Sequence, residues 1–301
     1  MKQAKIIVTD IPNFGDPFII IEDGVYYMFG TDRGLPFVCY KSSDGEHYDL
    51  VGQVLSSDDS FGVNDFWAPE VIKYNNEFYM FYSARDVDGV LKVSVAKSNK
   101  IIGPYKDINK SRALLDELGY ATIDASPFID IDGRIYLLFV RECSQQIING
   151  VHTSDTYIVE LDKLISKLIG KPIFLSTPTE SWERYEVDPY VWNEGPNVLY
   201  HNNKYYLVYS CHHFIDPNYS VGLSIADKIT GPYQKQIAGP ILKRIDGIMH
   251  GPGHSAFFKD LDGEIYMVYH IHKSLTDPHK GRVPCISKVI FEGDKLIIDY
   301  I

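Results

Sequence analysis

The sequence predicts an all-β fold of the five-bladed β-propeller class, and three features of its 301 residues predict it. A hairpin pattern occurs five times, with copies about 60 residues apart. Each copy turns on residues that tolerate positive φ, and its flanks are rich in Val, Ile, Tyr and Phe. Between copies there is room for further strands. Radially packed four-stranded sheets have this organisation, so we interpret residues 1–301 as one propeller domain.

The turns and tyrosines of the repeat define its register. The five turn pairs are Asp23-Gly24, Asn75-Asn76, Asp132-Gly133, Asn202-Asn203 and Asp262-Gly263. A tyrosine stands three residues after each pair, at Tyr27, Tyr79, Tyr136, Tyr206 and Tyr266. This spacing predicts one strand before each turn and one after it. The longest interval, between Tyr136 and Tyr206, indicates an insertion around residues 144–190.

Two other fold classes fit the repeat less well. An α/β fold needs an amphipathic helix between successive strands, and only residues 161–169 show a fair helical pattern. A β-sandwich has no reason to repeat the same turn chemistry at such regular intervals.

Composition excludes several classes of function. With 29 Lys+Arg against 40 Asp+Glu, the net charge is −11, which argues against nucleic-acid binding. No apolar run reaches the roughly 18 residues that a membrane span needs. The first eight residues lack the apolar stretch of a signal peptide, so we expect a cytoplasmic protein, or an extracellular one if the N-terminus was trimmed.

The cysteines predict no disulfide framework. Cys39, Cys143, Cys211 and Cys285 are far apart and form no Cys-x-x-Cys pair. We interpret them as four buried thiols of a reducing compartment. The oligomeric state stays open.

Equivalent positions at the start of each inner strand of a propeller converge at one mouth of the central channel. Counting back eight or nine residues from the second turn residue leads to Asp16, Trp67, Asp124, Glu194 and His254. Crowded carboxyl groups raise at least one carboxyl pKa, which supplies a proton donor at neutral pH. Two carboxyl groups that flank a small substrate can cleave a glycosidic bond. Positions across a channel mouth favour the wide, inverting separation of roughly 6.5–9.5 Å.

Other acids and histidines lie near these positions. Five acids fall outside the register: Asp65, Glu70, Glu183, Glu186 and Asp188. Glu186 and Asp188 lie in the insertion and could still reach the pocket. Two histidine pairs, His212-His213 and His270 with His272, lack the further ligands that a catalytic metal site needs. Aromatic rings near the blade heads, Phe128 among them, are candidates for stacking on a sugar.

The segments that contain these residues resemble glycoside hydrolase family 43, whose members are five-bladed propellers acting on arabinose- and xylose-containing polysaccharides. The matching segments are Gly-Asp-Pro-Phe at 15–18, Phe-Trp-Ala-Pro-Glu at 66–70, Ile-Asp-Ala-Ser-Pro-Phe at 123–128, Asn-Glu-Gly-Pro at 193–196 and Gly-Pro-Gly-His-Ser at 251–255. All five occur in order and in register, over nearly the full length.

The resemblance implies a role for each matched residue. It implies that Asp16 is the general base, that Asp124 orients the proton donor and tunes its pKa, and that Glu194 is the general acid. Trp67 corresponds to an aromatic that lines the sugar subsite, and Arg282 to an arginine that contacts a substrate hydroxyl.

The resemblance also implies a cofactor expectation. His254 corresponds to a histidine near the central channel that in some members helps to hold a hydrated calcium or sodium ion. We therefore expect no required cofactor, and a structural ion at most.

The sequence thus predicts an inverting glycosidase that cleaves α-L-arabinofuranosyl or β-D-xylosyl linkages in an oligo- or polysaccharide. A non-catalytic carbohydrate-binding propeller is the alternative from another class, and a related propeller enzyme of different sugar specificity is a third. Gly15-Asp16-Pro17 stands where fructan-active propellers carry an Asn-Asp-Pro-Asn-like motif, which argues against that group. The sequence does not distinguish specificity for arabinose from specificity for xylose, or exo action from endo action.

Overall fold

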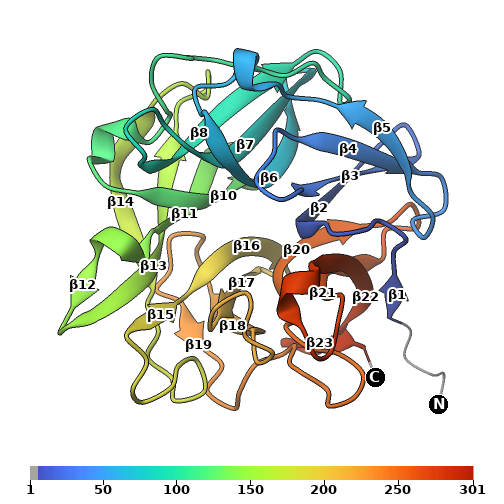
Figure 1. Ribbon diagram of the computed structural model, residues 1–301, viewed down its shortest axis with the longest axis vertical. Helices are drawn as coiled ribbons and strands as arrows, with labels where there is room; N and C mark the ends of the chain where they lie inside the picture. Colours follow the sequence, from blue (N-terminus) through green and yellow to red (C-terminus); the bar gives the residue numbers. More distant parts are fainter. Residues whose placement is uncertain (1–5, 301) are drawn as a thin grey trace.

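The computed structural model describes residues 6–300, which form five mainly antiparallel sheets arranged in a ring (Figure 1). The predicted all-β five-bladed propeller is therefore confirmed. Residues 1–5, on which the expected absence of a signal peptide partly rests, lie outside the described residues. In the described part, no helix is long and apolar enough to cross a bilayer.

Three blades have the predicted four strands. Blade 1 contains β2 (Gly15–Glu22), β3 (Val25–Thr31), β4 (Val38–Ser42) and β5 (Asp49–Gln53). Blade 2 contains β6 (Asn64–Tyr74), β7 (Glu77–Arg85), β8 (Leu91–Ser98) and β9 (Lys106–Asp107). Blade 4 contains β16 (Glu194–His201), β17 (Lys204–Cys211), β18 (Ser220–Ala226) and β19 (Gln234–Lys235).

Blades 3 and 5 carry additional strands. Blade 3 contains β10 (Thr122–Ile129), β11 (Ile135–Arg141), β13 (Val151–Leu161) and β14 (Leu168–Ser176), together with the short β12 (Ile147–Ile148) and β15 (Tyr190–Trp192). Blade 5 contains β20 (Gly253–Lys259), β21 (Ile265–His272), β22 (Arg282–Glu292), β23 (Lys295–Asp299) and β1 (Ile7–Val8). Because β1 pairs with β22, the two ends of the chain meet in one blade and close the ring.

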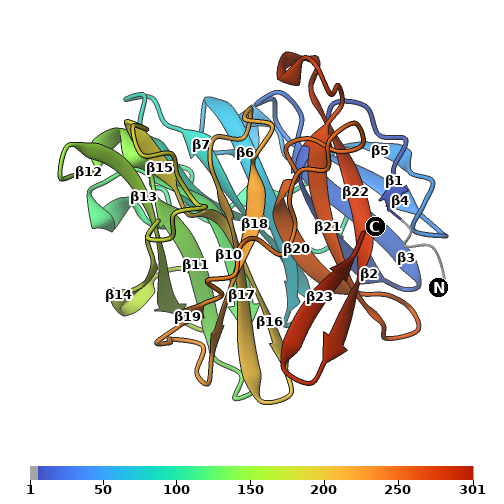
Figure 2. The same cartoon turned by 90° about the horizontal axis from the view of Figure 1, so that it is seen from below.

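Two details of the sequence interpretation are corrected. The predicted insertion contains β13 and β14, which are ordinary blade strands, so the extra structure is confined to residues 143–150 and 177–192. The helical pattern at 161–169 forms the turn between β13 and β14, and the helices in the described part are four 3-10 turns (Ser57–Asp59, Asp116–Leu118, Cys143–Gln145 and Pro278–Lys280). Figure 2 shows β12, β15 and the red loop before β22 at the same end of the ring.

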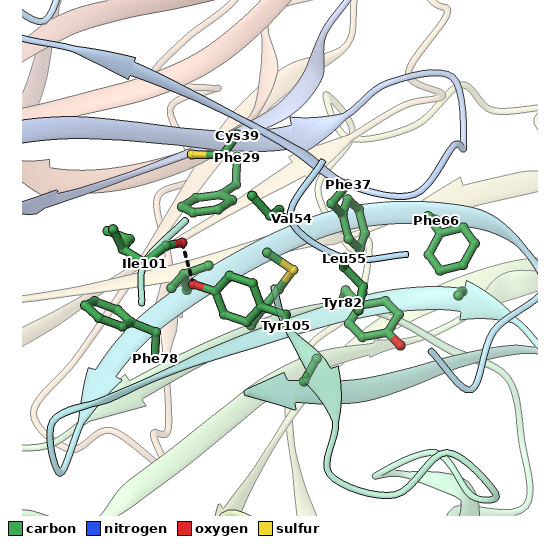
Figure 3. Close-up of a cluster of buried hydrophobic side chains, with 14 residues drawn as sticks. Phe29, Phe37, Cys39, Val54, Leu55, Phe66, Phe78, Tyr82, Ile101 and Tyr105 are labelled. Carbon is green, nitrogen blue, oxygen red and sulfur yellow. Dashed lines mark hydrogen bonds between the residues drawn. The ribbon is translucent and has the colours of Figure 1, made fainter. Parts of the chain in front are cut away.

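The hydrophobic core lies between neighbouring blades. Successive side chains of each strand point to opposite faces of the blade, and each face packs on a neighbouring blade. Each of the five blade interfaces therefore has its own buried cluster. Figure 3 shows the one between blades 1 and 2, where Phe29 and Phe37 meet Tyr82 and Tyr105. The Tyr105 hydroxyl donates to the Ile101 carbonyl oxygen over 2.9 Å, which satisfies its buried polar end.

The four cysteines are free and buried, as predicted.

Candidate active site

Every inner strand begins with an irregularity that redirects its backbone. The pairing register shifts within the first residues of β2, β6, β10, β16 and β20. One residue at each shift has positive φ, namely Asp16, Ala68, Asp124, Gly195 and His254, with φ between 47° and 55°. A bulge of this kind turns the strand end and points its side chain in a new direction. Non-glycine residues in this region cost energy, and such strain gathers at functional sites.

These positive-φ residues correct the predicted register. The structurally equivalent set contains Ala68 and Gly195, whereas Trp67 and Glu194 stand one residue earlier. Counting residues back from each turn gave positions one too early in blades 2 and 4, because the hairpin loops differ in length. Those of blades 3 and 5 contain five residues, between Ile129 and Ile135 and between Lys259 and Ile265. The other three hairpins close with two-residue turns.

Six of the seven predicted site residues nevertheless line one pocket of about 390 Å³, a volume typical of small-ligand sites. They are Asp16, Trp67, Asp124, Glu194, His254 and Arg282. The exception is Phe128, which lies further along β10 and packs edge-on against Tyr205 of blade 4, with ring centroids 6.1 Å apart. Proximity in sequence to Asp124 misled this prediction, because the strand runs away from the mouth.

Five equivalent positions on the second strands lie opposite the starts of the inner strands; we call them the latch positions. They are Thr31, Ser83, Val140, Ser210 and His270, which pair across their own blades with Gly15, Trp67, Ile123, Glu194 and Gly253. Four of their side chains accept the backbone N–H of the positive-φ residue in the next blade: Thr31 from Ala68 (2.9 Å), Ser83 from Asp124 (2.9 Å), Ser210 from His254 (2.8 Å) and His270 from Asp16 (3.2 Å).

Asp16 is held as a carboxylate by its neighbours. Its side chain is buried, and burial alone raises the pKa of a carboxyl. The Arg282 guanidinium is the strongest opposing influence, followed by His254, His270 and the Thr31 hydroxyl. Together these neighbours outweigh burial and hold the pKa of Asp16 well below its usual range. Arg282 Nη1 donates to Asp16 Oδ1 over 2.6 Å. A Cβ on Gly15 would stand 2.0 Å from Arg282 Cζ, so this close approach requires glycine.

Glu194 has the opposite electrostatic setting. Burial, followed by the nearby Asp124 carboxylate, raises its pKa well above the usual range, and a hydrogen bond from Tyr219 only partly offsets this. The Tyr219 hydroxyl donates to Glu194 Oε1 over 2.9 Å. The raised pKa favours the protonated form of Glu194, which is the form that can donate a proton. The repeat contains no signal for Tyr219, which lies in the loop before β18.

Asp124 lies beside both of these groups. Burial is the main cause that raises its pKa; His254 acts in the opposite direction and Asp16 adds to the increase. Its Oδ2 accepts the backbone N–H of Gly195 over 2.9 Å. This bond connects Asp124 to the peptide unit that follows Glu194.

Two histidines of blade 5 flank Asp16. His254 Nδ1 lies 3.4 Å from Asp16 Oδ1. His270 is fully buried and accepts from the Asp16 N–H through Nδ1, so its remaining proton lies on Nε2 and the ring is neutral. Burial holds the pKa of His270 well below its usual range, in agreement with this tautomer.

His254 is the residue beside which a structural ion is expected. Across residues 6–300, no group of three or more His, Cys, Asp or Glu side chains is placed to hold a metal ion. The expected ion near the central channel stays a prediction, and no catalytic step below depends on it.

The competing acids have other partners. Asp65 pairs with Arg85 over 2.7 Å. Glu70 lies deeper in the central channel, where it accepts from Ser126 and Asn197, and burial raises its pKa to about 8. Glu186 and Asp188, the two acids of the insertion, are absent from the pocket lining.

Glu183 anchors the insertion beside the site. Its fully buried carboxylate meets Lys235 of β19, with Nζ 2.6 Å from Oε1. Lys235 also donates to Asn193 Oδ1 over 2.9 Å, and Asn193 immediately precedes Glu194. The buried Glu183–Lys235 pair therefore fixes the backbone at Asn193, the residue before Glu194.

Lys235→Met is expected to lower the free energy of unfolding by about 3–5 kcal/mol, because it leaves the Glu183 carboxylate buried without its cation. Urea denaturation of the purified variant measures this loss. Lys204→Met is the matched control: its pair with Asp227 is exposed, and a loss below about 1 kcal/mol is expected. Equal losses in the two variants would contradict the anchoring role.

The central pocket of this propeller holds buried carboxyl groups whose pKa values are shifted in opposite directions. This is the architecture of a glycoside hydrolase. Residues 11–297 match Glycosyl hydrolases family 43, and the chain belongs to this family.

Known proteins agree with this assignment. The crystal structure of a thermostable family-43 glycoside hydrolase is 38% identical, with a TM-score of 0.91, covering 97% of this chain and 94% of that one. An endo-1,4-beta-xylanase from Bacteroides thetaiotaomicron is 28% identical, with a TM-score of 0.84, covering 98% and 96%. Among curated proteins, the beta-D-galactofuranosidase xynD of Aspergillus niger is 28% identical over 75% of this chain. The matches span 42% to 66% of the length of the first curated relatives.

Proposed function

We propose that this protein is an inverting glycosidase that cleaves α-L-arabinofuranosyl or β-D-xylosyl linkages. One observation carries the proposal: two carboxyl groups of one pocket have pKa values displaced in opposite directions, Asp16 downward and Glu194 upward. At neutral pH the first is a base and the second an acid, which is the pair that glycoside hydrolysis needs.

The chemistry follows from these protonation states. Asp16 accepts a proton from a water molecule as that water attacks the anomeric carbon, and Glu194 gives its proton to the leaving oxygen. Each turnover leaves Asp16 protonated and Glu194 ionised, and exchange with solvent restores both. Because the Tyr219 hydroxyl occupies Oε1 of Glu194, the other oxygen is left to face the substrate. Asp124 keeps the Glu194 proton in place until the leaving oxygen takes it.

The wall of the pocket supports a sugar ligand. Trp67 and Phe214 line it, and aromatic rings of this kind pack against the apolar face of a sugar. The similar xylanase supports a xylosyl substrate, and the galactofuranosidase supports a furanosyl one.

A hydrolysis screen tests this proposal. Its substrates are nitrophenyl α-L-arabinofuranoside, β-D-xyloside and β-D-galactofuranoside, together with arabinan and xylan. We expect release of arabinose or xylose. Binding of oligosaccharide without hydrolysis of any substrate would instead favour a carbohydrate-binding propeller.

Arg282→Gln is expected to move the acidic limb of the kcat/KM profile upward by about 1–3 pH units. Asp16 must be ionised to act as base, and without the guanidinium the effect of burial raises its pKa, so activity is lost at a higher pH as the solution is acidified. The profile of each variant measures the shift. Arg33→Gln is the control, because Arg33 also lines the pocket but pairs with Asp32. An unchanged acidic limb in Arg282→Gln would contradict the assignment.

A further inference from the structure

One latch position differs from the other four. Thr31, Ser83, Ser210 and His270 offer an oxygen or nitrogen to the N–H of the next blade, but Val140 has no polar atom to offer. The N–H left without this acceptor belongs to Gly195, and it donates instead to Asp124 Oδ2. The latch position without an acceptor, Val140, therefore belongs to the same blade as Asp124, the carboxyl group beside Glu194.

Alternation along β11 places Val140 on the strand face that it shares with Leu138, while its own hydrophobic cluster contains Ile123 of β10 and Leu91 of blade 2. Residues two apart on a strand share a face, and Leu138 on the same strand packs with Val198 and Leu207 of blade 4. Val140 itself is fully buried. A hydroxyl at this position would therefore stand where the other latch hydroxyls stand, within reach of the next blade's N–H.

Blade 1 shows what such a hydroxyl does. Thr31 accepts the N–H of Ala68 and also hydrogen-bonds the carboxylate of Asp16, so it stands between the backbone and the carboxylate. In blade 3 nothing stands between them, and the Asp124 carboxylate reaches the backbone of the next blade directly. The two acids are equivalent in the fold but are held by different partners.

We propose that Val140 is a positioning residue: by leaving its latch position without an acceptor, it delivers the Gly195 N–H to Asp124 and so holds that carboxylate against the strand that begins with Glu194. The inference rests on the proposed roles of Asp124 and Glu194. Val140 itself is absent from the pocket lining, but it shares a hydrophobic cluster with Ile123 and Trp67, which do line the pocket, so a packing control is needed.

Val140→Thr and Val140→Ala separate this role from simple packing. The threonine hydroxyl takes the Gly195 N–H and releases Asp124, whereas alanine offers no acceptor and leaves the bond in place. We expect Val140→Thr to lower kcat at least about tenfold on an unactivated disaccharide, with a smaller loss on an aryl glycoside that needs little protonation. We also expect the basic limb of its pH profile to move downward, because Asp124 no longer supports the protonated form of Glu194. Val140→Ala is expected to stay close to wild type in both measurements.

An NMR titration of the Gly195 amide proton gives a readout that does not require activity. In the wild type and in Val140→Ala, its chemical shift should follow the ionisation of Asp124, and in Val140→Thr this dependence should be lost. If the wild type hydrolyses no glycoside, the proposed function fails while the titration still decides the positioning role.

Two results would overturn the inference. One is a cooperatively folded Val140→Thr protein with wild-type kcat, basic limb and amide titration. The other is a Val140→Ala protein that is impaired as much as Val140→Thr, since that indicates packing alone. If Val140→Thr does not melt cooperatively, Val140→Ser places the same hydroxyl on a smaller side chain, and the same criteria apply to it.

Discussion

Asp16→Ala is expected to lower kcat by about 10²–10⁴-fold on every glycoside that the wild-type protein hydrolyses. Water activation is needed whatever the leaving group, so an activated aryl glycoside should lose as much as a natural disaccharide. The electrostatic setting supports this role, since the Arg282 guanidinium counters burial and keeps the Asp16 pKa well below its usual range. Steady-state kinetics on both kinds of substrate measure the loss.

Two further variants make the Asp16 result interpretable. Asp16→Asn removes the base but keeps an oxygen for the Arg282 hydrogen bond, so it separates lost chemistry from lost folding. Asp65→Ala is the matched control, because Asp65 lies in the neighbouring motif but pairs with Arg85. If Asp16→Asn folds and retains near wild-type activity, Asp16 is not the base.

Glu194→Gln is expected to act selectively. On an unactivated disaccharide, kcat should fall by about 10²–10⁴-fold, because the leaving oxygen departs only if it receives a proton. On a dinitrophenyl glycoside the loss should be small, since that leaving group is stable as an anion. The basic limb of the kcat/KM profile should also disappear, because burial and Asp124 raise the Glu194 pKa and its ionisation causes that limb. Kinetics on the two substrates across pH measure both effects.

The pattern across substrates decides the Glu194 assignment. Equal losses on both substrates would indicate that Glu194 binds the sugar or supports the fold and does not donate the proton. Tyr219→Phe is the companion variant. It removes the hydrogen bond to Oε1, which favours the ionised form of Glu194, so the basic limb should move to higher pH while activity below it is kept.

Much of the fold could be predicted from the sequence because the repeat is local. The turn pairs and the tyrosines behind them each specify one hairpin, and all five hairpins are present. The pairing of β1 with β22 could not be predicted in this way, because two residues carry too little pattern to reveal a partner at the other end of the chain.

The site was predicted less completely, for physical reasons. Counting from the turns located Asp16, Asp124 and His254, but it treated Trp67 and Glu194 as their equivalents because hairpin loop lengths differ between blades. The latch positions do have a signal in the sequence: each lies four residues after a repeat tyrosine, at 31, 83, 140, 210 and 270. What the sequence could not indicate is that four of these side chains bond to the next blade.

The most direct test of the account is the anomeric configuration of the first product, followed by proton NMR during hydrolysis of the best substrate. A base and an acid that act on opposite sides of the sugar, with water between base and anomeric carbon, predict inversion: a β-D-xyloside first yields α-xylose, and an α-L-arabinofuranoside first yields the β anomer. A first product of retained configuration would contradict the assignment, because it requires one of these carboxyl groups to attack the sugar itself.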